Sequence, residues 1–70
     1  MTRFLRYSLE RGRKIRAVYS LEGKILQKTV LVLAWDENTV TLQSGKKPPV
    51  TIPMRDLLAC GYARGDDGEE

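Results

Sequence analysis

The chain has 70 residues, the size of one small domain with a thin hydrophobic core. Hydrophobic residues make up 41% and charged residues 30%, which is typical of globular proteins and not of disordered chains. There is no histidine and a single cysteine, Cys60, which excludes disulfide frameworks, zinc sites built from Cys and His, and catalysis through an imidazole. We therefore expect a protein that is not an enzyme and that uses no cofactor and no metal.

The first residues predict a short helix over about residues 2–12. Phe4, Leu5 and Leu9 fall on one apolar stripe, which a helix this short must dock on another part of the chain. Gly12 is a suitable stop at its C-terminal end. The segment lacks the continuous apolar core of a signal peptide, and no stretch approaches about 18 apolar residues. We expect a cytoplasmic protein that does not enter a membrane.

From Lys14 the apolar period changes to two, which indicates a half-buried strand. Glu22-Gly23 predicts a tight hairpin turn, in which the glycine supplies a positive φ. A long second strand follows over Lys24–Trp35, and its second half is apolar at every position, as in a strongly bent strand with both faces covered. Three shorter strands complete the prediction, at about 39–43, 50–54 and 59–63. The expected core residues on the strands are Ile15, Leu31, Leu33, Val40, Leu42 and Ile52.

This order of elements resembles the Sm-like small barrels. The residues that carry the resemblance are the helix FLRYSLERG, the strand KIRAVYS, and the segments GKILQ, VLAWDENTVTLQ and VTIPMRDLLACG. The bacterial Hfq proteins share the N-terminal helix and a similar hairpin, and the WYL-type and YolD-like barrels are similar in layout. The resemblance implies a mainly β domain over residues 1–63: a five-stranded Sm-like (SH3-like) small barrel with a short N-terminal helix. Residues 64–70 are expected to form an acidic disordered tail.

The resemblance also implies proximity to nucleic acid, but it transfers no binding residue. The Tyr-Lys-His run of Hfq RNA sites has no counterpart here, where Ile52-Pro53-Met54 stands in that neighbourhood. The Trp-Tyr-Leu run of WYL domains is also absent, since Trp35 is followed by Asp36. The candidate binding residues must therefore come from charge and aromatic content alone.

Positive charge is concentrated in residues 1–30, which hold eight cations against two carboxylates. A surface of this kind suits the phosphates of RNA or DNA, and it is equally what a solvated face of a small soluble domain would carry. Tyr7 is the aromatic side chain best placed to stack on a base. The candidate nucleic-acid-binding residues are Arg3, Arg6, Tyr7, Arg11, Arg13, Lys14, Arg16 and Lys28.

These observations predict a non-catalytic bacterial module that binds nucleic acid or accompanies nucleic-acid-processing proteins. The alternative is a protein-interaction or assembly module that pairs through exposed strand edges, without binding nucleic acid. Pro53 would blunt one such edge because proline has no amide hydrogen for a ladder. We therefore expect a monomer or a dimer and not an extended ring.

Overall fold

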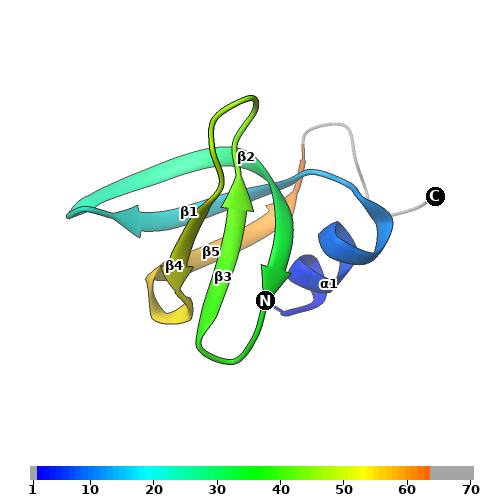
Figure 1. Ribbon diagram of the computed structural model, residues 1–70, viewed down its shortest axis with the longest axis horizontal. Coiled ribbons are helices and arrows are strands. Elements are labelled where there is room, and N and C mark those ends of the chain that lie inside the picture. The colour runs from blue at the N-terminus through cyan, green and yellow to red at the C-terminus, as the bar shows by residue number, and fades with distance from the viewer. Residues whose placement is uncertain (1, 64–70) are drawn as a thin grey trace.

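The computed structural model describes residues 2–63, which form one N-terminal helix and five antiparallel strands (Figure 1). This confirms the predicted mainly β chain with a short helix at its start. The predicted acidic tail, 64–70, lies outside the described residues. The elements are α1 (Thr2–Arg11), β1 (Ile15–Leu21), β2 (Lys24–Trp35), β3 (Thr39–Gln43), β4 (Val50–Pro53), the 3₁₀ turn η1 (Met54–Asp56) and β5 (Leu57–Tyr62).

The long strand β2 belongs to both halves of the sheet. Its residues Lys24–Val30 pair with β1, and its residues Leu31–Trp35 pair with β3. β4 then adds to β3 and β5 adds to the free side of β1, so the strand order is β4-β3-β2-β1-β5. Figure 1 shows β2 curving between the two halves, as the apolar second half of this strand predicted.

The sheet is not closed into a barrel, which corrects the closed architecture expected from the sequence. β4 and β5 are its two edges, and no ladder joins them within residues 2–63. Between them the chain makes only the turn η1, and β4 ends at Pro53, which has no amide hydrogen to donate to a neighbouring strand. The strand order therefore has two open ends.

Two tight reversals follow from glycines at positions that the sequence singled out. α1 ends where Gly12 adopts a φ of 64° and the Arg13 amide donates to the Ser8 carbonyl at 3.2 Å, the pattern of a Schellman cap. In the β1–β2 hairpin, Glu22 has a φ of 53° and Gly23 a φ of 80°. Positive φ at both central positions is the signature of a type I′ turn, so Glu22 holds a left-handed conformation that suits glycine or asparagine better.

The buried core lies between α1 and the inner face of the sheet, the face on which β1 places Ile15 and Ala17. The opposite face, which carries Arg16 and Val18, is called the outer face below. Four of the strand residues predicted for the core are buried, and they are joined by others that were not predicted. The buried hydrophobic residues are Leu5, Ile15, Ala17, Tyr19, Val30, Val32, Val40, Leu42, Ile52 and Leu57.

The predictions for Leu9, Leu31 and Leu33 are wrong. Leu9 is 43% exposed and Leu33 is 38% exposed, while Leu31 is half-buried. Val30 and Val32 set the inward phase of β2, so Leu31 and Leu33 fall at the alternate, outward positions, and Leu33 also lies at the register shift between Val32 and Ala34. The residues of β2 that do enter the core are its neighbours Val30 and Val32.

Candidate nucleic-acid interface

Six of the predicted cations follow one another along α1, its connection to β1 and the start of β1. All six are exposed, and Glu10 is the one carboxylate among residues 2–16. We call residues 2–16 the basic segment. Six cations against one carboxylate give residues 2–16 a net positive charge. Its cations are Arg3, Arg6, Arg11, Arg13, Lys14 and Arg16.

Lys28, the remaining predicted cation, lies on β2, outside residues 2–16. It lies opposite Ala17 in the β1–β2 ladder, on the inner face of the sheet, and it is half-buried. Arg16 projects from the outer face, one position away on β1. The alternation of strand side chains therefore places Lys28 and Arg16 on opposite faces of the same hairpin.

Tyr7 is half-buried and belongs to an aromatic cluster that joins α1 to the end of β5. Its ring makes a T-shaped contact with Tyr62, with centroids 5.4 Å apart and planes at 80°. Phe4 makes a similar contact with Tyr62 at 4.9 Å and 73°. These edge-to-face arrangements are the favoured geometry of aromatic pairs. Tyr62 was not among the predicted site residues, because only the fold brings the end of β5 beside α1.

Arg3 links the positive charge to this aromatic cluster. Its Nη2 atom donates to the Tyr62 hydroxyl at 3.5 Å, and its guanidinium carbon lies 5.5 Å from the centre of the Phe4 ring. The second distance falls in the range of a cation–π contact. Arg3 therefore helps to hold the Tyr62 ring against α1 while remaining exposed to solvent.

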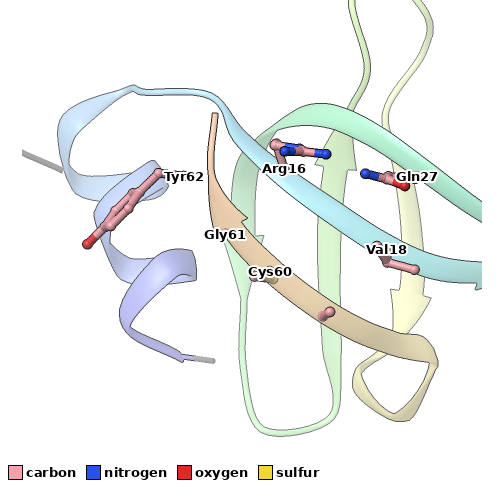
Figure 2. A pocket seen from close by; sticks show the side chains of 7 residues that line it. Arg16, Val18, Gln27, Cys60, Gly61 and Tyr62 are labelled. Carbon is pink, nitrogen blue, oxygen red and sulfur yellow. The ribbon is translucent and has the colours of Figure 1, made fainter. Parts of the chain in front are cut away.

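A hollow of about 200 Å³ lies on the outer face, where β1 is flanked by β2 and β5, and Tyr62 belongs to both the hollow and the aromatic cluster (Figure 2). In the ladder Arg16 lies opposite Gly61 and Val18 lies opposite Ala59, so small residues of β5 face larger ones of β1. Figure 2 shows the Arg16 and Gln27 side chains extending toward one another over β1. The lining residues are Arg16, Val18, Gln27, Ala59, Cys60, Gly61 and Tyr62.

Cys60 and Tyr19 are the described residues whose side-chain pKa is raised by burial. Burial raises the pKa of the Cys60 thiol, which keeps it protonated at neutral pH and a poor nucleophile. Burial likewise raises the pKa of the Tyr19 hydroxyl. Within residues 2–63 there is no group of three or more His, Cys, Asp or Glu side chains able to hold a metal ion.

Asp36 is an exposed carboxylate with a structural role in the β2–β3 turn. Its Oδ1 accepts hydrogen bonds from the Asn38 amide at 2.7 Å and the Thr39 amide at 2.8 Å. The bonds from Thr39 and then Asn38 lower the pKa of the Asp36 carboxyl from its ordinary value of 3.8. The Asp36 carboxylate therefore stabilises the β2–β3 turn through these two hydrogen bonds.

None of the helices described in residues 2–63 is long and apolar enough to cross a membrane. Comparison of the chain with protein-family models, with curated proteins and with solved structures found no match.

Proposed function

We propose that this chain is a non-catalytic, Sm-like nucleic-acid-binding module that holds its ligand by the phosphates. The observation that carries the proposal is the basic segment, where six exposed cations stand against one carboxylate. Cations of this kind displace condensed counterions from a phosphate backbone, which supplies affinity without choice of sequence. The N-terminal helix and the order of the five strands support the Sm-like part of the proposal.

The aromatic cluster favours single strands over duplexes as the ligand. Unpaired bases expose faces that can pack on aromatic rings next to cations, whereas bases in a duplex are already stacked on each other. Tyr62 is half-buried and is held beside the basic segment by Arg3. A single strand that follows the cations of α1 would therefore meet an aromatic edge at the end of β5.

The alternative function, a module that pairs through a strand edge, is favoured by one observation. β5 is an edge strand, and the sequence Leu57–Tyr62 contains no charged residue and no proline. The other edge, β4, ends at Pro53 and is preceded by Pro49. Charges and prolines are the usual protection of an edge, so β5 is the edge that would accept another strand.

The test is the salt dependence of oligonucleotide binding. Fluorescence anisotropy with labelled single-stranded RNA, single-stranded DNA and duplex DNA should show single strands bound more tightly, with affinity falling steeply as salt rises. The double variant Arg6→Gln/Lys14→Gln should weaken binding to all sequences and reduce the salt slope on single strands by about 1.4, which is about 0.7 for each lost contact. These two side chains do not line the hollow, so the test is independent of it.

Lys46→Gln/Lys47→Gln is the matched control, because it removes the same charge from the exposed β3–β4 loop outside the basic segment. It should leave the slope unchanged. If the unmodified chain binds no oligonucleotide at about 50 mM salt, where counterion release favours association, the proposal fails. A dimer in sedimentation equilibrium that is lost on placing a charge at Leu58, an exposed residue of β5, would then favour the edge-pairing alternative.

A further inference from the structure

Gly61 is the next-to-last residue of the edge strand β5, and the fold gives no reason for a glycine there. Its φ is not positive, and a Cβ atom built on it would meet nothing within 4 Å. The irregularity in the β1–β5 ladder lies elsewhere, between Val18 and Tyr19. Glycine weakens a strand, and where neither a bend nor close packing requires it, it often marks the approach of a ligand. Here the space it leaves open is part of the hollow.

The open space over Gly61 forms the bottom of the hollow, and two side chains with hydrogen-bonding groups stand at its side. Arg16 lies directly opposite Gly61, and Gln27 lies opposite Val18. Within residues 2–63 no hydrogen bond or ion pair engages either side chain. The guanidinium is a planar fork of donors, while the amide can both donate and accept. The guanidinium of Arg16 and the amide of Gln27 can therefore bind a ligand that lies on Val18, Ala59 and Gly61.

The size of the hollow limits what it can hold. At about 200 Å³ it is smaller than the pockets of about 300–1,000 Å³ that enclose whole drug-sized ligands. It suits one planar ring that rests on Val18, Ala59 and the backbone of Gly61. Because Arg16 offers donors only, the edge of that ring must present acceptors.

We infer that the hollow is a subsite for one unpaired guanine of a single strand held by the basic segment. Guanine presents two adjacent acceptors, O6 and N7, and arginine commonly donates to both at once. Arg16 belongs to the basic segment as well as to the hollow, and Arg13 and Lys14 connect it to α1, so a strand that passes from α1 onto the outer face of β1 would bring a base to this point. The inference rests on the proposed function, and it adds a base preference that phosphate contacts do not provide.

The experiment compares three labelled deoxythymidine oligonucleotides of about twelve nucleotides, a length within the usual site sizes of single-strand-binding domains. One contains thymine only, one carries a central guanine, and one carries 7-deazaguanine, which lacks N7. The readout is the ratio of Kd values between the first oligonucleotide and each of the others. For the unmodified chain we expect the guanine oligonucleotide to bind about tenfold more tightly, and the 7-deaza analogue to lose most of this gain.

Two variants test the hollow in different ways. Gly61→Val fills the hollow with a side chain that strands favour and for which there is room. The ratio of Kd values between the thymine and guanine oligonucleotides should then fall close to one. Arg16→Lys keeps the positive charge but loses the planar fork, and it should also abolish the preference. Ser20→Val is the matched control, since Ser20 projects from the outer face of β1 but does not line the hollow. It should keep the tenfold ratio.

The outcomes separate this inference from the proposed function. Equal, salt-dependent binding of all three oligonucleotides by the unmodified chain would overturn the guanine subsite and leave the proposed function standing. A guanine preference that survives both Gly61→Val and Arg16→Lys would place the base elsewhere and also overturn it. If Gly61→Val instead converts a dimer into a monomer, the hollow is occupied by a second copy and the inference is wrong. Absence of binding to every oligonucleotide overturns both proposals together.

Discussion

The side-chain oxygen of Ser8 accepts a hydrogen bond of 2.9 Å from the backbone amide of Val32. Both residues are buried, and the bond joins α1 to the point where β2 departs from regular pairing with β3. The β1–β2 ladder ends with Ile15 opposite Val30, so β1 offers Val32 no partner, and a buried amide needs an acceptor. Ser8 supplies that acceptor, which explains why a polar residue occupies the buried side of a short amphipathic helix.

Replacing Ser8 with alanine should therefore destabilise the protein by about 1–3 kcal/mol, because the Val32 amide would remain buried without an acceptor. Urea unfolding followed by circular dichroism measures the change. Ser20→Ala is the control, since Ser20 is half-buried on the outer face, away from the helix. If both variants lose the same free energy of unfolding, the hydrogen bond from Val32 to Ser8 does not contribute to stability.

Glu22→Asn should stabilise the protein by about 1 kcal/mol. Glu22 adopts a φ of 53°, which is costly for most L-residues, and Asn-Gly is the preferred pair at the centre of a type I′ turn. Thermal unfolding at fixed pH gives the comparison. Glu22→Gln removes the same charge without relieving the backbone, so a matching gain in that variant would assign the effect to electrostatics.

The two leucines Leu42 and Leu33 should respond very differently to truncation, although both were expected in the core. Leu42 is 1% exposed, and Leu42→Ala should cost about 2–5 kcal/mol. Leu33 lies at the bulge with 38% exposure, and Leu33→Ala should cost less than about 1 kcal/mol. Denaturant midpoints measured side by side test this order. A cost for Leu33 equal to that for Leu42 would contradict the exposed position of the bulge.

Acid should weaken the β2–β3 turn through Asp36. Its pKa is lowered in the folded state by the Thr39 and Asn38 amides, so its contribution to stability is fully present above the unfolded value. That contribution is lost as the pH falls from the ordinary value of 3.8 through the lowered pKa. Asp36→Asn keeps an acceptor in the turn but does not titrate over this range.

The measurement is urea unfolding at a series of pH values from about 6 to about 2, with the slope compared between variants. Asp36→Asn should show a shallower fall in stability below pH 3.8 than the unmodified chain. Glu37→Gln, at the next residue, controls for the loss of an exposed carboxylate. An unchanged acid slope in Asp36→Asn would show that the turn does not depend on ionised Asp36.

The elements were predictable from sequence where local chemistry decides them. Gly12 ends the helix and Gly23 lies in the hairpin turn because both positions need a positive φ, which glycine adopts without strain. The alternation of β1 is correct from Ile15 to Tyr19 because one face of that strand is buried and the other is not. These features depend on residues adjacent in the sequence.

The errors arose where contacts distant in sequence decide the outcome. Leu9 was placed in the core by its hydrophobicity, but α1 docks through Leu5 and Ser8, three residues apart, which leaves Leu9 turned outward. Leu31 and Leu33 were misplaced because a uniformly apolar stretch does not show which of its two alternating sets faces the core, and the structure buries Val30 and Val32 instead.

Some residues of the candidate site could be predicted from the sequence, and others depend on contacts between distant segments. The exposed cations of the basic segment could be identified by composition, since charged side chains on a small domain are rarely buried. The separation of Arg16 from Lys28 follows from strand alternation once the register is known. The roles of Tyr62 and Gly61 could not be predicted, because they depend on the pairing of β5 with β1 across more than half of the chain.

The division of β2 between two partners has a consequence for how the protein opens. A strand hydrogen-bonded to β1 over its first half and to β3 over its second cannot be released from one without disturbing the geometry that the other requires. We expect amide hydrogens around Val30 and Val32 to exchange only through global unfolding, while those of the edge strand β4 exchange through smaller local openings. The centre of β2 would then report the full stability of the molecule in native-state hydrogen exchange.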